Sequence, residues 1–442
     1  MHPILKIYPV AALAFFCACG HAKKAQSIEV NPPAADSSQV NETGNDVSNS
    51  SDKLIENILK AYPQYFDSIL AKRKDLKLQI IYTAIDRNKK NQPSFVSHYF
   101  NVNADNYFYP ASTVKMPVAL LALQKLNELN IKGVDKNTSF ITETGFEGET
   151  PVYNDPNTPD GRPTIANYVR KIFLVSDNDA YNRLYEFLGQ EYINDHLHGM
   201  GYNSPCIVHR LEVSMNEEQH RNTNPVKFLD SANNVLYSQP LQRSNFVYPD
   251  RHDSVANAYY KNGELINQPM NFSRKNKISL QDLTNILKSI LFPQEVAPNQ
   301  RFNLTEEDYA LVKKYMSQFP GETTFPQYDT TEFYDAYVKL LKYGSGKGTL
   351  PKQIRIFNKE GDAYGFLTDI AYIADFENNI EFMLSATIYC NSDGVMNDDH
   401  YDYDTVGYPY LKHLGEVFYN YELQRKRKHA PDLSNFKITY DK

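Results

Sequence analysis

Residues 112–126 read Ser112-Thr-Val-Lys-Met-Pro-Val-Ala-Leu-Leu-Ala-Leu-Gln-Lys-Leu, an apolar helical pattern that opens on Ser-x-x-Lys. Positions i and i+3 of a helix lie on one face, so the Lys115 amine can sit beside the Ser112 hydroxyl. A serine is a weak nucleophile at neutral pH and needs an adjacent base. A lysine whose pKa is lowered by burial or by neighbouring cations can be that base.

The Ser-x-x-Lys spacing alone is weak, because a motif this short recurs by chance. Ser50 and Lys53 have the same spacing inside a polar stretch. Ser112 differs from Ser50 in its context, since it follows the aromatic run Tyr107-Phe-Tyr-Pro and begins an apolar helical pattern. We therefore select Ser112 and Lys115 as the reactive pair.

Two further motifs follow in order along the chain. Ser176-Asp177-Asn178 comes after the helix-like stretch 164–173, and Lys359-Glu360-Gly361 ends the strand-like run Ile354-Arg-Ile-Phe-Asn. This trio resembles the motifs of class A β-lactamases and penicillin-binding proteins, a superfamily of serine hydrolases. Arg210-Leu-Glu-Val-Ser-Met-Asn-Glu217 also resembles the Ω-loop of the class A enzymes.

The resemblance implies a role for each matched residue. Ser112 would attack a carbonyl, Lys115 would take its proton directly or through Ser176, and Ser176 would relay a proton to the leaving group. Glu212 would activate the water that removes the acyl group. Asn178 would donate a hydrogen bond to the substrate or to Lys115, and Lys359 would hold a substrate carboxylate. Gly361 and the N–H groups of Ser112 and Asp362 would form the oxyanion pocket, and Asn216 would hold the water.

Plainer interpretations stand beside these roles. Ser, Asp and Asn all favour helix caps, so Ser176-Asp177-Asn178 could simply begin a helix. A glutamate-rich loop is usually just solvated, which applies to Glu212. Asn222 stands where the family often has an aspartate that pairs with the loop arginine, and the loop is short. Both departures predict a less rigid loop.

Glu360 departs from the family, which usually has Ser or Thr at this position. Two unit charges of the same sign 4 Å apart repel by about 4 kcal/mol at an effective dielectric near 20. A Glu360 side chain that points into the cleft therefore predicts poor binding of penicillins. The two other possibilities are that Glu360 pairs with Lys359 or that it favours a cationic substrate.

Three rival motifs are rejected. Lys342-Tyr343-Gly344 follows a helix-like run, unlike Lys359. Gly344-Ser-Gly-Lys-Gly-Thr349 lacks the first glycine of a phosphate loop and runs into Leu350-Pro351 instead of a helix. The acidic stretch 393–404 is interpreted as a hydrated loop, so we predict no metal site. The mechanism implied by the resemblance needs no cofactor.

Composition limits the class of protein. The 442 residues are 41% hydrophobic and 22% charged, which is typical of one large or two ordinary globular domains. A net charge of −7 gives no reason to expect nucleic acid as a partner. We expect a monomer that acts on a small acyl substrate. Cys206 and Cys390 could form one disulfide, but two free buried thiols are preferred.

Residues 1–19 resemble an export signal that ends in the lipobox-like Phe16-Cys-Ala-Cys19. Its apolar run is too short to span a bilayer. We predict an exported, periplasmic protein that is anchored to a bacterial membrane through lipidated Cys19. Residues 20–52 are rich in Ser, Asn, Pro and acids, which is typical of a flexible tether.

The remaining pattern predicts a single α+β domain over residues 53–425, followed by a polar tail at 426–442. A helix at 52–73 precedes strands at 76–85 and 94–102. Helices follow at 112–130, 164–173, 177–188, 279–291 and 305–319, then strands at 354–358, 363–374 and 381–390, and a last helix at 407–426. This order predicts an antiparallel sheet of N- and C-terminal strands packed by terminal helices, with an inserted all-helical lobe. That is also the β-lactamase/transpeptidase-like fold that the resemblance implies. A polar stretch at about 226–275 has no counterpart there.

Three functions follow in order of preference. The first is β-lactam hydrolysis through an acyl-enzyme on Ser112, as in class A β-lactamases. The second is an esterase, amidase or D,D-peptidase of the same fold, which Glu360 and the 226–275 insertion favour. The third is a non-catalytic envelope binding protein, which the joint presence of the motif residues opposes.

Overall fold

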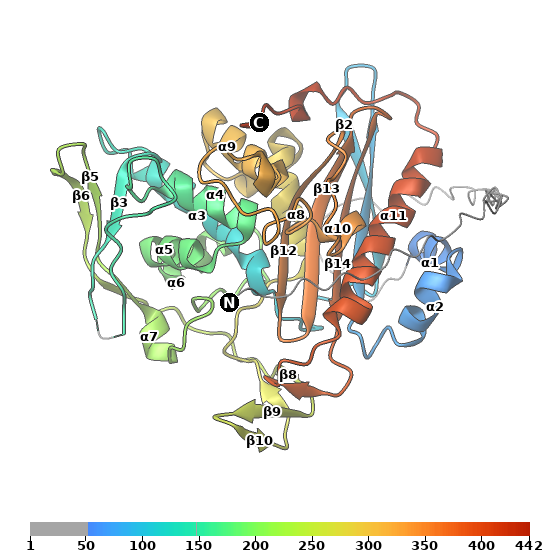
Figure 1. Cartoon of the computed structure of the whole chain (residues 1–442), viewed down its shortest axis with the longest axis horizontal. Helices are drawn as coiled ribbons and strands as arrows, with labels where there is room; N and C mark the ends of the chain where they lie inside the picture. Colours follow the sequence, from blue (N-terminus) through green and yellow to red (C-terminus); the bar gives the residue numbers. More distant parts are fainter. Residues whose placement is uncertain (1–51, 147) are drawn as a thin grey trace, which may run out of the picture.

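The computed structural model describes residues 52–146 and 148–442, and its centre is a five-stranded antiparallel sheet. The strand order is β12-β13-β14-β1-β2, with β1 Gln79–Arg87, β2 Pro93–Phe100, β12 Ile354–Ala363, β13 Phe366–Asp375 and β14 Ile380–Tyr389. The pairing of β1 with β14 joins the N-terminal and the C-terminal strands in one sheet, with Gln79 opposite Thr387. Figure 1 shows this sheet between the terminal helices and the lobe. The predicted α+β fold is therefore confirmed.

The predicted signal peptide, Cys19, the tether up to residue 51 and the rival Ser50 lie outside the described residues.

The central strands β13 and β14 are buried on both faces of the sheet, which explains their nearly continuous apolar sequences. All ten residues of β13 are buried. Ile370 and Tyr372 pack into the core on the lobe side, whereas Ala371 and Ile373 pack into the core under the terminal helices. The alternation follows from the two-residue period of a strand.

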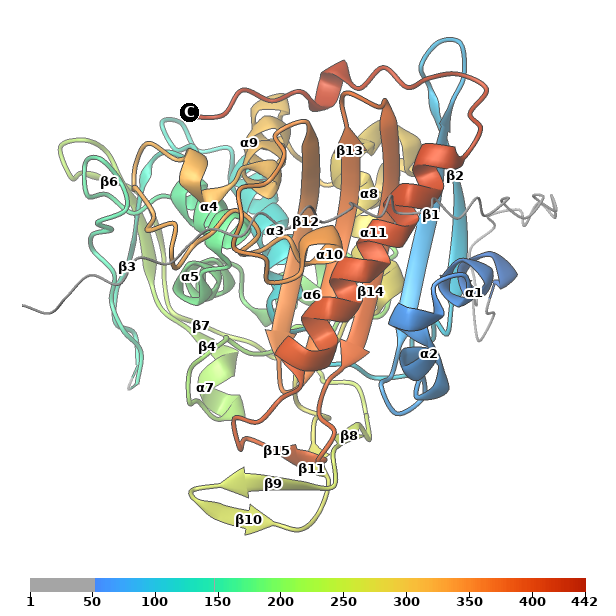
Figure 2. The same cartoon turned by 45° about the vertical axis from the view of Figure 1, so that its right-hand side comes forward.

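The terminal helices α1 Lys53–Lys60, α2 Pro63–Ala71 and α11 Tyr408–Gln424 cover one face of the sheet (Figure 2). Asp52 caps α1, and its Oδ1 accepts a hydrogen bond from the Leu54 N–H at 2.7 Å. The predicted single helix at 52–73 is divided into α1 and α2. Pro63 begins α2 and has no N–H with which to continue α1.

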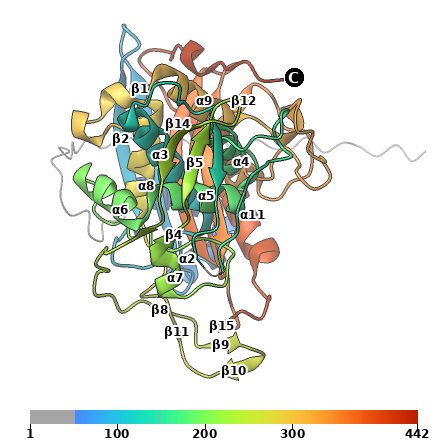
Figure 3. The ribbon, with the colours of Figure 1, turned by 90° about the vertical axis from the view of Figure 1, so that its left-hand side faces the viewer.

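The lobe stands on the other side of the sheet. Its helices are α3 Lys115–Leu129, α4 Ile165–Val175, α5 Asn178–Leu188, α6 Gln190–Gly199, α7 Glu217–Arg221, α8 Leu280–Leu291 and α9 Glu306–Ser317. Helix α8 packs against the sheet and joins the two parts. The lobe also carries a small sheet of β3 Ser139–Thr142, β5 Val226–Leu229 and β6 Val235–Gln239, which the prediction of an all-helical lobe missed. Figure 3 looks onto the side of the lobe that carries this sheet.

The 226–275 stretch folds as short strands. After β5 and β6 come β7 Gln242–Arg243, β8 Ser254–Val255, β9 Ala258–Lys261, β10 Glu264–Ile266 and β11 Met270–Asn271. β9 and β10 form a hairpin that also pairs with β15 Val395–Met396, near the lower end of the view in Figure 2. The insertion is thus tied to the loop that follows β14.

Residues 426–442 are not simply a polar tail. Leu433 and Phe436 are buried in the lobe-side core, next to a short turn at Ser434–Phe436. The Phe436 ring lies 4.8 Å from the Tyr372 ring, measured between centroids. Cys206 and Cys390 are both free and buried, as preferred. No helix within 52–146 and 148–442 is long and apolar enough to cross a membrane.

Candidate active site

Ser112 lies in a 3₁₀ turn, η1 Ala111–Val114, directly before α3. The predicted helix start is thus refined, because the α-helix itself begins at Lys115. Ala111 has the left-handed φ of 46°, a strained value for a residue with a side chain. The Thr113 hydroxyl donates to the Pro110 carbonyl at 2.7 Å and holds the turn. Strain of this kind persists where the surroundings fix the backbone, often at functional sites.

Lys115 is completely buried one turn from Ser112. Its Nζ donates to the Ser176 carbonyl and lies 3.4 Å from the Ser176 Oγ. Burial and the positive charge of Lys359 lower the pKa of Lys115 to about 7. A large share of Lys115 is therefore neutral at neutral pH, as a general base requires.

Ser176 ends α4 with the left-handed φ of 58°, and Asp177 then caps α5. The Asp177 Oδ1 accepts from the Ala180 N–H at 2.7 Å, so the helix-cap interpretation holds for that residue. Ser176 instead turns its hydroxyl to the two lysines of the site. Ser176-Asp177-Asn178 therefore both caps a helix and supplies a hydroxyl to the site.

Lys359 lies on β12 and is completely buried. Its Nζ donates to the Ser176 Oγ at 2.8 Å, to the Glu360 carbonyl at 2.9 Å and to the Glu360 Oε1 at 2.8 Å. Burial opposes ionisation of Glu360, but the Lys359 ammonium prevails and holds the pKa of that carboxyl below its ordinary value. Of the possibilities for Glu360, the structure has it paired with Lys359.

Gly361 brings the edge of the sheet against the serine. A Cβ at Gly361 would lie 2.7 Å from the Pro110 carbonyl oxygen and 2.8 Å from the Ser112 nitrogen. These atoms belong to the backbone, so only glycine fits there. β12 is an edge strand and contacts the turn η1, and Asp362 follows Gly361 on it. The side chain of Asp362 is exposed.

Glu212 faces Asn178 across the site. The Asn178 Nδ2 donates to the Glu212 Oε2 at 2.6 Å, and Glu212 has the left-handed φ of 55°. Asn216 is placed differently from the expected water ligand. It caps α7, where its Oδ1 accepts from the Gln219 N–H at 2.9 Å and its own N–H donates to the Gln219 Oε1. The Asn216 oxygen is therefore used by a capping box.

The loop that carries Glu212 is anchored by Arg210. This buried guanidinium pairs with Glu149 at 2.8 Å and with Glu186 at 3.2 Å, and it donates to the Asn222 carbonyl at 2.8 Å. Burial and the Glu186 carboxylate raise the pKa of Glu149 to about 8, against the opposite effect of Arg210. Two distant glutamates thus take the place of the missing aspartate as partners of Arg210. No sequence motif marked either of them.

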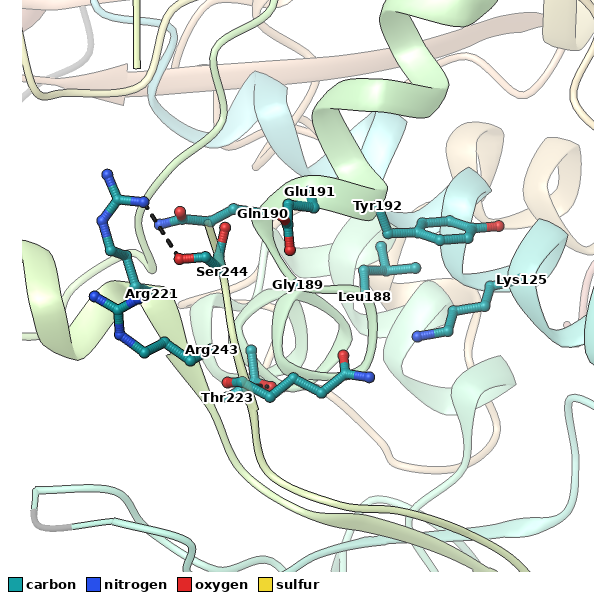
Figure 4. A pocket seen from close by; sticks show the side chains of 11 residues that line it. Lys125, Leu188, Gly189, Gln190, Glu191, Tyr192, Arg221, Thr223, Arg243 and Ser244 are labelled. Atoms are coloured by element: carbon teal, nitrogen blue, oxygen red, sulfur yellow. Dashed lines mark hydrogen bonds between the residues drawn. The ribbon is translucent and has the colours of Figure 1, made fainter. Parts of the chain in front are cut away.

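A cavity of about 580 Å³ lies elsewhere, around the junction of α5 and α6 (Figure 4). It is lined by Lys125, Leu188, Gly189, Gln190, Glu191, Tyr192, Arg221, Thr223, Gln242, Arg243 and Ser244. None of the predicted site residues belongs to this lining. Over residues 52–146 and 148–442, no group of three or more His, Cys, Asp or Glu side chains is arranged to hold a metal ion.

The structure thus gathers Ser112, Lys115, Ser176 and Lys359 where an edge strand meets the lobe, with Asn178 and Glu212 in mutual contact. This arrangement and the fold define a serine hydrolase of the β-lactamase and penicillin-binding class. Residues 64–402 match the model of the Beta-lactamase enzyme family, and the chain belongs to that family.

Solved structures of the same class were also found. A β-lactamase from Sphaerobacter thermophilus DSM 20745 is 11% identical, with 84% of this chain and 98% of that chain covered and a TM-score of 0.44. A class A β-lactamase from Clostridium kluyveri DSM 555 is 14% identical, with coverages of 81% and 98% and a TM-score of 0.42. The structure named PBP-A is 16% identical, with coverages of 84% and 97% and a TM-score of 0.44. No curated protein matches the chain.

Proposed function

We propose that this protein hydrolyses acyl substrates through a covalent acyl-enzyme on Ser112. The observation that carries the proposal is the buried Lys115, whose pKa is lowered to about 7 one turn from the serine. The Ser112 Oγ attacks the carbonyl while its proton passes to Lys115, directly or through Ser176. The N–H groups of Ser112 and Asp362 stabilise the oxyanion. The leaving group then departs with a proton returned through Ser176.

The second half of the reaction uses Glu212. Its carboxylate takes a proton from water, the oxygen attacks the acyl carbonyl, and the Ser112 Oγ leaves as the alcohol when that proton is passed to it through Lys115. The Asn178 amide at 2.6 Å supports this role by orienting the carboxylate. Since the Asn216 oxygen is used by the helix cap, we assign the positioning of the water to Glu212 and Asn178.

Two substrate classes are candidates. The first is a β-lactam, which membership of the Beta-lactamase enzyme family favours. The second is an ester, an amide or a D-alanyl peptide. The pairing of Glu360 with Lys359 favours the ester and the amide of the second class. It uses the cation that the carboxylate of a β-lactam or of a D-alanyl leaving group would need.

The test is an intact-mass time course of the purified protein with benzylpenicillin and, separately, with a fluorophosphonate probe. We expect the probe to modify wild type and not Ser112→Ala, because only the activated serine reacts. A penicillin adduct that appears and clears identifies a β-lactamase, and one that persists identifies acylation without deacylation. If neither reagent modifies Ser112, the acyl-enzyme proposal fails and a binding role without catalysis replaces it.

We also propose that the protein is exported and anchored through lipidated Cys19. The supporting feature is the Phe16-Cys-Ala-Cys19 stretch after the apolar run. Expression with a radiolabelled fatty acid tests this. We expect label in the membrane fraction for wild type and none for Cys19→Ala. Label on neither protein would contradict the anchor.

A further inference from the structure

Lys359 has no hydrogen-bond donor left for a substrate. An ammonium group has three protons. Three acceptors lie around the Lys359 Nζ, namely the Ser176 Oγ, the Glu360 carbonyl and the Glu360 Oε1, at 2.8–2.9 Å. The side chain is also completely shielded from solvent. A substrate carboxylate could reach this cation only by displacing one of its present partners.

Glu360 is the partner that a carboxylate would have to replace, and it is hard to displace. Its side chain is 6% exposed and is held by the Lys359 ammonium at 2.8 Å. Removing one member of a buried ion pair leaves the other charge without compensation, which is strongly unfavourable. An incoming anion that took the Lys359 ammonium would leave the buried Glu360 carboxylate without a partner. The two negative charges would also repel each other.

The surroundings of the pair are acidic as well. Glu212 is an exposed carboxylate at the same site, whereas the pKa of Lys115 is lowered to about 7. Tyr337 and Tyr408 lie close by, since after burial the Glu360 and Asp362 carboxylates raise the pKa of both phenols. Both rings are partly exposed, and aromatic faces attract cations. The site therefore opposes anions and accepts neutral or cationic groups.

The Lys359–Glu360 pair acts on the leaving-group side of the scissile bond. Lys359 donates to the Ser176 hydroxyl, and Ser176 is the group that returns a proton to the leaving atom in the proposed reaction. We propose that Glu360 determines specificity. It closes Lys359 to carboxylates, so that the enzyme takes acyl donors whose leaving group is uncharged or cationic. This inference rests on the proposed acyl-enzyme function.

The experiment compares three phenylacetyl thioesters that differ only in the leaving thiol. The thiols are mercaptopropionate, mercaptopropionamide and thiocholine, which are anionic, neutral and cationic in turn. Release of thiol is followed with a thiol-reactive dye after subtraction of spontaneous hydrolysis. For wild type we expect kcat/KM for the anionic thioester to be at least about tenfold below that of the neutral one, a difference of about 1.4 kcal/mol. The cationic thioester should match or exceed the neutral one.

Two substitutions test the role of Glu360 itself. Glu360→Gln keeps the size and removes the charge, and Glu360→Thr introduces the residue type usual in the family. We expect either change to raise the anionic-to-neutral ratio of kcat/KM by about tenfold. Glu322→Gln is the control, because it breaks another buried carboxylate pair, with Arg355 of the same strand β12, away from Ser112. It should leave the ratio unchanged.

The outcomes separate this inference from the proposed function. Wild type that hydrolyses the anionic thioester as fast as the neutral one overturns the inference and leaves the acyl-enzyme intact. The same holds if folded Glu360 variants keep the wild-type ratio. If those variants fail to fold, the comparison of the three thioesters with wild type still tests the inference. Absence of turnover with all three thioesters, together with no fluorophosphonate adduct on Ser112, overturns the function itself.

Discussion

Burial decides what Lys115 can do. A lysine amine in water has a pKa near 10.4, so it is protonated at neutral pH and cannot act as a base. At the site the side chain is fully shielded and lies close to the charge of Lys359, so its pKa falls to about 7. The three hydrogen bonds of Lys359 to oxygen acceptors stabilise its own charge. A large share of Lys115 is therefore neutral at neutral pH.

The lowered pKa of Lys115 predicts the pH dependence of acylation. Because only neutral Lys115 accepts the Ser112 proton, the rate should rise about tenfold per pH unit below pH 7 and level off above it. The measurement is the pseudo-first-order rate of fluorophosphonate labelling between about pH 5.5 and about pH 8.5. Lys115→Arg is the control, since a guanidinium stays protonated and should label slowly throughout. A flat wild-type profile would remove Lys115 from the role of base.

At the scale of elements, the contact between strand β12 and the turn η1 sets the reacting geometry. Gly361 is the closest point, where a methyl group would meet backbone atoms at 2.7–2.9 Å. Gly361→Ala should therefore push Ser112 away from the strand. We expect acylation to fall by about 100-fold, because small displacements of reacting groups are costly. The unfolding free energy should fall by about 1–3 kcal/mol from overpacking.

Mass spectrometry and urea denaturation measure the two effects of Gly361→Ala. Gly199→Ala is the matched control, because a Cβ at Gly199 meets nothing within 4 Å. That variant should label at the wild-type rate. If Gly361→Ala also labels at the wild-type rate, the strand does not position the serine.

The Glu212 loop depends on the buried Arg210. Replacing Arg210 with Met removes the cation shared by Glu149 and Glu186 and leaves Glu186 only Arg183 at 3.6 Å, so we expect the unfolding free energy to fall by about 3 kcal/mol. The acyl-enzyme should also persist longer, because the loop holds the deacylating group. Arg243→Met is the comparison, since Arg243 and Glu218 form a half-exposed surface pair. It should behave like wild type in denaturation and in mass spectrometry. Equal stability of the two variants would contradict the anchoring role of Arg210.

At the scale of the whole molecule, one sheet separates two hydrophobic cores. The terminal helices close one core and the lobe closes the other, and the chain end packs into the lobe side through Leu433 and Phe436. The Phe436 ring contacts Phe292, Phe357 and Tyr372 with centroid distances of 4.8–5.7 Å. The last residues are therefore a structural part of the domain.

Phe436→Ala should lower the unfolding free energy by about 3 kcal/mol, because it removes a buried ring and leaves a cavity. Urea denaturation measures this loss. Val247→Ala is the control, since Val247 is 85% exposed and should change stability by less than about 0.5 kcal/mol. If the two variants are equally stable, the chain end does not contribute to the core.

Periodicity predicted most of the elements, because burial on one face leaves a pattern in the residues themselves. Local residue types also fix where helices begin: Asp52 caps α1, and a capping box at Thr305 begins α9. The short strands of 226–275 were missed. Strands of two to five residues are too brief for an alternation to stand out, and they depend on partners such as Val395–Met396 that lie far along the chain.

The sequence by itself determined the fold class, the order of the three motifs and the choice of Ser112 and Lys115, since these follow from local spacing and from apolar patterns. Only the tertiary structure decided that Glu360 pairs with Lys359 and that Arg210 is held by Glu149 and Glu186. It also decided that Asn216 caps a helix. The physical reason is the same in each case. A pattern of residues indicates which side chains are buried, whereas the partner that a buried charge finds depends on which distant segments pack against it.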